Sequence, residues 1–285
     1  MEPMNIKRAK TQGFCFGVAI TVKKAEEAVA APGARVTTLG HVVHNPQMVA
    51  TLEEKGLRNA HSVEDVDDGG TLFVRAHGLP LETFERAKAK NLTVIDATCP
   101  MVTKIHVQAE KLKNDGYKIV VVGDASHPEV KGTLSHVPGA WCIQEVADVA
   151  KLPRASRVGV VVQSTWSGAG FTDIVRALSE KYYEVRAVNT ICTDTHNRQN
   201  EAQTLSREVE VMVVVGGKTS ANTKHLADLS AHNGARAYHI EGPDELDPVW
   251  FHGVQRAGLM SGASTPGWLV DAVEARMNEL SRIAG

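Results

Sequence analysis

Three cysteines recur at nearly even spacing along the chain, and each lies between a strand pattern and a helix pattern. Cys15 and Cys99 are 84 residues apart, and Cys99 and Cys192 are 93 residues apart. The amphipathic stretches that follow them are residues 18–29, 102–114 and 196–209. A repeat of this length predicts three copies of one structural unit rather than three unrelated segments.

The register of the repeat continues beyond these helices. Each helix leads into a β-branched run with a polar turn at its end, and then into a further strand and a further helix. The β-branched runs are residues 35–39, 118–122 and 211–215, and their turns carry His44, His127 and Ser220. The further strands are residues 71–77, 158–165 and 258–265, and they end on His77, Thr165 and Ser264. The further helices are residues 82–90, 171–181 and 267–283. This alternation predicts an α/β fold with mainly parallel sheets.

The third unit lacks the strand that, in the other two, leads to the next cysteine. Conversely, the strand expected at Asn5–Thr11, ahead of Cys15, has no helix before it. We therefore expect the N-terminal strand to complete the third unit and close a ring. The expected architecture is a trefoil of three pseudo-threefold-related α/β modules. Their bounds are 12–97, 98–190 and 191–285, the last completed by strand 1–11.

The three cysteines, the turn residues His44, His127 and Ser220, and the strand-end residues His77, Thr165 and Ser264 all follow expected strands; we call them the marked residues. Because functional groups gather at the carboxyl ends of parallel strands, we expect the marked side chains to face one centre. Helix N-termini lower the pKa of a thiol, so three thiols just before helices favour thiolate ligands for a metal. Because no fourth cysteine occurs in the same register, the metal site is expected to keep one open position. Zinc with three protein ligands and an iron–sulfur cluster both fit, with softness favouring the cluster; plain burial is the remaining alternative. Cys142 has no counterpart in the repeat and is predicted to pack in the core.

The remaining marked side chains are hydrogen-bond donors, which suit a phosphate or diphosphate. They are His44, His77, Thr165, Ser220, Asn222 and Ser264. Ser220 and Asn222 could instead cap a helix that begins near Thr223. Glu129 is an acid at a marked turn that could carry protons, with His127 beside it; its alternative is a first-turn glutamate that favours the helix dipole. The chain has no GxxxxGK[ST] and no dinucleotide fingerprint, so nucleotide hydrolysis and NAD chemistry are disfavoured.

Composition excludes several other classes. The net charge is −2 with acids and bases interspersed, and aromatic residues make up 5% of the chain, so no nucleic-acid surface is expected. No apolar run is long enough for a membrane span, and the N-terminus lacks the apolar stretch of a signal peptide. The sequence therefore predicts a cytoplasmic protein whose four cysteines form no disulfide framework.

The motifs, taken in order, resemble one known family. They are GFCFGV, HVVHN, AHG, DATCPMVTKIH, HPEVKGT, QST, TICTDTHNRQ, GGKTSANT and SGASTP. The set extends from Cys15 to Ser264 and is similar to the 4-hydroxy-3-methylbut-2-enyl diphosphate reductases, the LytB/IspH family. The resemblance implies the last step of the methylerythritol phosphate route to isoprenoids. In that step two electrons and two protons remove the hydroxyl of an allylic diphosphate as water, which yields isopentenyl and dimethylallyl diphosphates.

The resemblance also implies roles for individual residues. One [4Fe–4S] cluster would lie at the centre of the trefoil on Cys15, Cys99 and Cys192, with a fourth iron open to the substrate hydroxyl. The implied diphosphate ligands are His44, His77, Ser220, Asn222 and Ser264. Glu129 would deliver protons with His127 close by, and Thr165 would contact the hydroxyl. A ferredoxin or flavodoxin electron donor and a monomeric state are implied in the same way.

One departure is Ala221, which stands where many family members have a second serine. Three rival hypotheses remain open at this level. The first is a non-redox dehydratase that uses the cluster as a Lewis acid. The second is a non-catalytic cluster sensor or phosphometabolite-binding protein, and the third is a zinc enzyme.

Overall fold

The chain folds into two compact units, and the computed structural model describes residues 4–283. The first unit comprises residues 1–19, 43–51 and 193–285, and the second comprises residues 20–42 and 52–192. Two helices, α1 (Phe16–Ala30) and α2 (Pro46–Glu54), contribute residues to both. The described strands form three four-stranded sheets in which every pairing is parallel.

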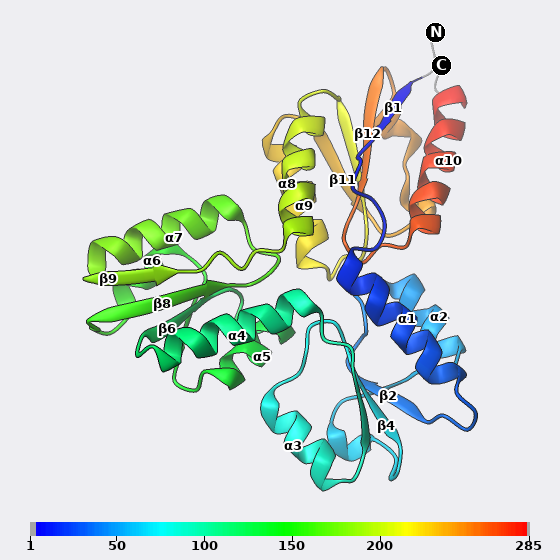
Figure 1. Ribbon diagram of the computed structural model, residues 1–285. Helices are drawn as coiled ribbons and strands as arrows, with labels where there is room; N and C mark the ends of the chain where they lie inside the picture. The colour runs from blue at the N-terminus through cyan, green and yellow to red at the C-terminus, as the bar shows by residue number, and fades with distance from the viewer. Residues whose placement is uncertain (1–3, 284–285) are drawn as a thin grey trace. The chain divides into compact units, whose positions relative to one another are not determined.

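The first unit contains one sheet, of order β1-β12-β10-β11, with helices on both faces (Figure 1). Its strands are β1 (Asn5–Arg8), β10 (Val211–Val215), β11 (Arg236–Ile240) and β12 (Arg256–Ser261). Its helices are α8 (Thr193–Ser206), α9 (Ala221–His232) and α10 (Gly267–Ile283), with short 3₁₀ turns at Pro243–Glu245 and Pro248–Phe251.

Strand β1 is the N-terminal strand, and it pairs in parallel with β12 near the other end of the chain. Asn5 lies opposite Arg256, and Arg8 lies opposite Leu259. The prediction that the N-terminal strand completes the third unit is therefore confirmed. The regular strand ends at Arg8 rather than Thr11, since the backbone bends at Lys10 and Thr11.

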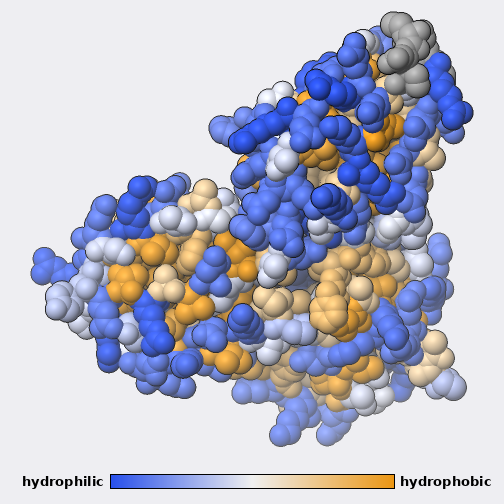
Figure 2. All heavy atoms as spheres, turned by 45° about the horizontal axis from the view of Figure 1, so that its top comes forward, coloured by the Kyte–Doolittle hydropathy of each residue, from blue (hydrophilic) through white to orange (hydrophobic). Residues whose placement is uncertain are grey.

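The core of the first unit follows the two-residue period of a strand. Val211, Val213 and Val215 of β10 pack with the buried face of α10, which includes Val273 and Met277. The alternate residues of β10, Met212 and Val214, pack on the opposite face with Leu226 of α9 and Ala202 of α8. Figure 2 shows that the visible surface of the lobe of β1, α8 and α10 is mostly hydrophilic, as expected when the apolar positions face inward.

The second unit contains the other two sheets, of order β3-β2-β4-β5 and β7-β6-β8-β9. The strands of the first are β2 (Val36–Leu39), β3 (Arg58–Ala60), β4 (Thr71–Val74) and β5 (Thr93–Asp96). Those of the second are β6 (Lys118–Val122), β7 (Trp141–Ile143), β8 (Arg157–Val162) and β9 (Glu184–Ala187). The accompanying helices are α3 (Leu81–Ala89), α4 (Pro100–Asn114), α5 (Pro128–His136), α6 (Val146–Lys151) and α7 (Gly168–Lys181), with a 3₁₀ turn at Val63–Asp65.

All three sheets have the same strand order. The strand after each cysteine helix (β2, β6 or β10) lies between a short edge strand (β3, β7 or β11) and a longer inner strand (β4, β8 or β12). The fourth position holds the strand that leads to the next cysteine, which is β5, β9 or β1. The α/β class and the threefold internal repeat are therefore confirmed, while the residue bounds of the modules stay a prediction.

The segments after the marked turns are more elaborate than predicted. Between each turn and the further strand lie a helix (α2, α5 or α9) and a short edge strand (β3, β7 or β11). Two of these edge strands, β3 and β7, have only three residues each, and Arg58–Ala60 has no β-branched residue, so they carry little strand signal. The third, β11, has five residues. Helix α9 begins at Ala221 rather than near Thr223, since Ser220 caps it.

Helix α4 illustrates how a cysteine turn becomes a helix start. Pro100 follows Cys99 at the first helical position, where a proline's fixed φ and missing N–H cost nothing. Ile105, Ala109 and Leu112 then form a buried face that packs on β6 and β8. Gly116, with a φ of +83°, allows the chain to turn back into β6.

Candidate active site

The three cysteines occupy equivalent positions relative to the strands. Each donates its backbone N–H to a carbonyl that follows the inner strand of a sheet. These hydrogen bonds are Cys15 to Ala263, Cys99 to Ala76 and Cys192 to Ser164, each 2.9 Å long. Because each bond extends the parallel pairing beyond the regular strands, it holds the cysteine at the carboxyl edge of its sheet.

The residue after each accepting carbonyl is one of the predicted substrate ligands. Ser264 follows Ala263, His77 follows Ala76, and Thr165 follows Ser164. These three residues therefore occupy equivalent positions in the structure, although the number of residues between each of them and its cysteine differs. The register inferred from the sequence has a physical basis in this common hydrogen bond.

In the second unit, Cys99 and Cys192 are close enough for their charges to interact. Burial raises the pKa of the Cys99 thiol, with smaller contributions from Cys192 and Glu129, and N–H groups of Met101 and Val102 oppose the increase. The helix start lowers the pKa of Cys99 as predicted, through the N–H groups of Met101 and Val102, but burial outweighs this effect and the net change is upward. A cation bound to both sulfurs would stabilise their thiolate forms.

Glu129 lies in the first turn of α5, with 2% of its surface exposed. Its carboxyl group accepts hydrogen bonds from the backbone N–H and the hydroxyl of Ser164, both 2.6 Å long. Burial raises the pKa of Glu129, and the two bonds from Ser164 limit the increase. A buried acid with a raised pKa keeps its proton to higher pH and can donate it to a bound ligand.

His127 is the N-cap of α5, and its Nδ1 accepts the N–H of Glu129 at 3.3 Å. Burial lowers the pKa of His127, and nearby Arg75 adds to this effect while Asp124 opposes it. With Nδ1 as acceptor, the neutral ring carries its proton on Nε2. The ring meets His77 edge-to-face, with 5.5 Å between centroids.

Thr165 is oriented by its neighbour Gln163. The side-chain NH₂ of Gln163 donates to the Thr165 hydroxyl at 3.0 Å, and its carbonyl accepts the N–H of Asp124 at 3.1 Å. Gln163 is buried, so both bonds form away from solvent. The hydroxyl of Thr165 is thereby fixed at the strand end next to Ser164.

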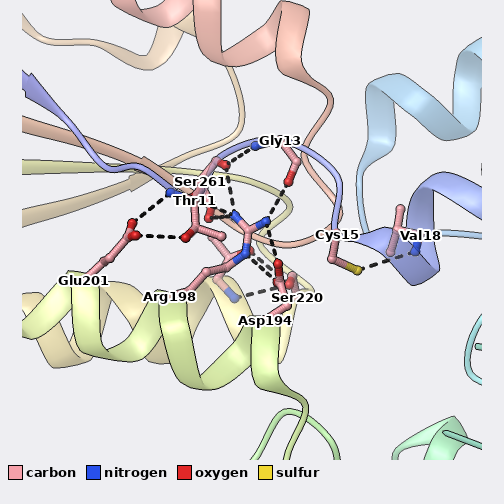
Figure 3. A network of polar contacts seen from close by, with 10 residues as sticks. Thr11, Gly13, Cys15, Val18, Asp194, Arg198, Glu201, Ser220 and Ser261 are labelled. Carbon is pink, nitrogen blue, oxygen red and sulfur yellow. Dashed lines mark hydrogen bonds and ion pairs between the residues drawn. The ribbon is translucent and has the colours of Figure 1, made fainter. Parts of the chain in front are cut away.

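In the first unit, the loop of Cys15 is anchored to β12 and α8 (Figure 3). The N–H of Gly13 donates to the hydroxyl of Ser261 at 3.0 Å. The thiol of Cys15 accepts the N–H of Val18 at 3.4 Å in the first turn of α1. Cys15 therefore lies at a helix start, as Cys99 and Cys192 do.

The predicted ligand His44 lies against two other motifs of the same unit. Its carbonyl accepts the Ser264 hydroxyl at 3.3 Å. A Cβ at Gly217 would clash with this carbonyl, so a glycine is required where the GGKTSAN turn passes His44. The residue that caps α2 is Asn45 rather than His44, since its side chain accepts the N–H of Met48.

Ser220 and Asn222 differ in how their side chains are used. Ser220 caps α9 by accepting the N–H and the hydroxyl of Thr223. Asn222 is only 5% exposed, yet neither atom of its amide group has a hydrogen-bond partner. Because a buried amide without partners costs free energy, the side chain of Asn222 does not stabilise the fold through hydrogen bonds, and both of its polar atoms are available to a ligand.

The predicted site residues thus form two sets, one in each compact unit. The first unit holds Cys15, His44, Ser220, Asn222 and Ser264, and the second holds His77, Cys99, His127, Glu129, Thr165 and Cys192. Cys142 belongs to neither set: its thiol donates to the carbonyl of Gly123 at 3.3 Å, and the half-buried side chain packs against the core that includes α4 and α5 residues, in keeping with a packing role. Within the described residues, none of the four cysteines forms a disulfide.

Sequence reasoning missed Ser164, Gln163 and Arg198. Ser164 binds Glu129, Gln163 binds Thr165, and Arg198 binds the carbonyls of Thr11 and Gly13 ahead of Cys15, so most of these contacts join distant segments. Ser164 and Gln163 stand beside Thr165 in QST, which was the only signal for them. Arg198 in THNRQ carried no signal of its own.

Comparison with known proteins identifies the family. The sequence model of the family described as LytB protein matches residues 6–278. The chain belongs to the LytB family.

LytB relatives match over almost the whole length of the chain. A protein of Anaeromyxobacter sp. (strain Fw109-5), described as 4-hydroxy-3-methylbut-2-enyl diphosphate reductase, is 45% identical over 98% of this chain and 99% of its own. A protein of Geobacter sulfurreducens with the same description is 44% identical over 97% of this chain and 98% of its own.

Solved LytB structures match as well. One is the structure of (E)-4-hydroxy-3-methyl-but-2-enyl diphosphate reductase, the terminal enzyme of the non-mevalonate pathway, with a TM-score of 0.73 and 39% identity over 97% of this chain and 99% of that one. The reductase of Plasmodium falciparum gives a TM-score of 0.91 and 30% identity, over 95% of this chain and 86% of that one. Within residues 4–283, no helix combines the length and apolarity that a membrane span requires.

Proposed function

We propose that this chain reductively removes the hydroxyl group of (E)-4-hydroxy-3-methylbut-2-enyl diphosphate and releases isopentenyl and dimethylallyl diphosphates. The observation that carries the proposal is the match to reductases along 98% of the chain at 45% identity. The local chemistry supports it, since a buried acid, a histidine with a lowered pKa and the partnerless amide of Asn222 suit a polar substrate that must be protonated as it reacts.

The cofactor is an iron–sulfur cluster, in keeping with the family. Cys15, Cys99 and Cys192 are proposed to hold one [4Fe–4S] cluster and to leave the fourth iron open. Three observations support this ligand set: no disulfide joins the three cysteines, each lies at a helix start, and each is held by the same backbone hydrogen bond. The fit is chemical as well, because thiolates are the preferred ligands of iron–sulfur centres. When bound, the cluster supplies electrons and a Lewis-acidic iron to the substrate hydroxyl.

The diphosphate is proposed to bind to hydrogen-bond donors from both sets. They are His44, His77, Ser220, Asn222 and Ser264. Asn222 gives the strongest support, because its buried amide lacks protein partners and a phosphate oxygen would satisfy its NH₂ group. Ala221 cannot donate from its side chain, so this chain has one hydroxyl fewer at the turn than relatives with serine there.

Protons are proposed to reach the departing hydroxyl through Glu129. Its raised pKa lets the carboxyl group hold a proton to higher pH than an exposed glutamate does, and Ser164 fixes that group's position. Thr165, which Gln163 orients, contacts the substrate hydroxyl. His127, whose Nδ1 accepts the N–H of Glu129, donates a hydrogen bond to the substrate from its Nε2–H group. These groups orient the substrate alcohol and protonate it as it leaves as water.

The remaining proposals concern the setting of the reaction. A ferredoxin or flavodoxin would supply the electrons, and the chain would act as a monomer. Cysteines that form no disulfide fit a reducing compartment, which favours the cytoplasm.

The test is turnover under anaerobic conditions with reconstituted protein, with and without a reduced electron donor. The proposal predicts diphosphate products only when the donor is present, in amounts that match the electrons consumed. Turnover that proceeds equally well without a donor would instead establish a Lewis-acid dehydratase. Tight substrate binding with no turnover under any reducing condition would indicate a sensor.

A further inference from the structure

Arg198 is the largest of the fully buried side chains in the described part of the molecule, with 1% of its surface exposed. It lies on α8, which begins directly after Cys192, and the proposed reaction gives it no role. A buried guanidinium requires several acceptors because it has five N–H donors and keeps its charge. The identity of these acceptors therefore indicates what Arg198 does.

The acceptors come from three segments of the first unit (Figure 3). Asp194, one turn earlier on α8, accepts from Nε at 2.7 Å and balances the charge. The carbonyl of Gly13 accepts from one terminal nitrogen at 2.9 Å, and the carbonyls of Ser261 and Thr11 accept from the other at 2.9 and 3.2 Å. The planar fork thus joins α8, the end of β12 and the segment that leads to Cys15.

This segment, residues 11–15, has no helix or strand of its own. Its course depends on side chains: Glu201 of α8 accepts the N–H and hydroxyl of Thr11, and Ser261 accepts the N–H of Gly13. Gly13 has a φ of +72°, which other residues adopt only with strain. The two carbonyls bound by Arg198 therefore lie on both sides of the turn that sets the position of Cys15.

We propose that Arg198 is a positioning residue that holds the Cys15 loop in the geometry required to bind the iron–sulfur cluster. This inference rests on the proposed function, which gives Cys15 its role as ligand. A loop fixed in advance loses less conformational entropy when its thiolate binds iron. Lysine cannot replace Arg198, because one ammonium group cannot reach carbonyls in three directions in the way a planar fork does.

The test compares iron loss from reconstituted Arg198→Lys and Gly13→Ala with that from the wild type. Gly13→Ala disturbs the same loop through its φ and leaves the ion pair of Arg198 intact; a Cβ there meets only Gly267, at 3.8 Å. Release of iron to a chelator under anaerobic conditions should be about 10- to 100-fold faster in both variants. The electron paramagnetic resonance spectrum of the reduced cluster should also change, since a displaced Cys15 alters one iron site.

The matched control is Met277→Ala, which removes a buried side chain of α10 in the same unit, away from the loop. Variants are compared at temperatures equally far below their melting points, so that a general loss of stability cancels. Faster iron loss in Gly13→Ala and Arg198→Lys than in Met277→Ala supports the inference. If Gly13→Ala loses iron no faster than Met277→Ala and its spectrum is unchanged, the geometry of the Cys15 loop does not matter for cluster binding. This result overturns the inference even if Arg198→Lys fails to fold. A wild-type protein that takes up no cluster would refute the proposed function instead.

Discussion

Ser164 donates two hydrogen bonds to the carboxyl group of Glu129, one from its backbone N–H and one from its hydroxyl. Both favour the ionised acid, whereas burial favours the protonated acid and prevails, so that the pKa of Glu129 is raised. Since the N–H of Cys192 binds the carbonyl of Ser164, one residue connects the proposed proton donor with a proposed cluster ligand.

Removal of the Ser164 hydroxyl should raise the pKa of Glu129 further, because the ionised form loses one of its two hydrogen bonds. Activity that requires protonated Glu129 falls as the pH rises through this pKa, so Ser164→Ala should shift the alkaline limb of the pH–rate profile to higher pH. Glu129→Gln should lower kcat about 10²- to 10⁴-fold and retain the cluster. An alkaline limb that stays in place in Ser164→Ala would assign it to another group.

Asn222→Ala should weaken substrate binding without weakening the fold. The amide is buried and has no partners, so its removal should leave the free energy of unfolding unchanged or increased. KM for the diphosphate should rise, because the phosphate loses a donor. The comparison is Ser220→Ala, which removes the cap of α9 and should cost about 1 kcal/mol of stability. Equal destabilisation of both variants in denaturant unfolding would show that Asn222 is structural.

His106 should make the protein sensitive to acid. It is 7% exposed on α4 and stacks on His136; burial, then the charge of His136, lowers its pKa from 6.5 to about 4. Between these pH values the unfolded chain binds a proton that the folded chain does not, so stability is full above pH 6.5 and is lost as the pH falls toward 4.

Replacement of His106 by glutamine should therefore reduce the loss of unfolding free energy over this pH range by about 3 kcal/mol. Denaturant unfolding of the two proteins at both ends of the range measures this difference. The variant His252→Gln, at an exposed position, controls for the loss of a histidine. A pH dependence identical to that of the wild type would show that His106 does not set it.

Substitution of the cysteines should separate ligands from packing. Cys15→Ser, Cys99→Ser and Cys192→Ser should each lose most of the bound iron, because a hydroxyl is a poor ligand for iron–sulfur centres. Cys142→Ser is the matched control: its thiol donates to a backbone carbonyl, which a hydroxyl can also do, and it should retain full iron content. Iron analysis after anaerobic reconstitution distinguishes these outcomes, and loss of iron in Cys142→Ser would contradict the ligand assignment.

The sequence predicted the features that depend on local periodicity and on the repeat. The third unit lacked a fourth strand, and the N-terminal stretch Asn5–Thr11 was the one expected strand without a unit. In the structure, β1 takes this position beside β12. The three-residue edge strands carried too little pattern to be found. Arg198 was missed because its acceptors lie up to 187 residues away in the chain, and the raised pKa of Cys99 because burial is set by tertiary packing.

The assignment of Cys15, Cys99 and Cys192 as cluster ligands is tested most directly by the metal content of the protein purified without oxygen. The protein should be brown, with about four iron and four sulfide ions per chain and broad visible absorbance that decreases on reduction. It also predicts that Cys15, Cys99 and Cys192, but not Cys142, are protected from alkylation until the cluster is removed. A colourless protein with a single zinc ion per chain would contradict the central claim.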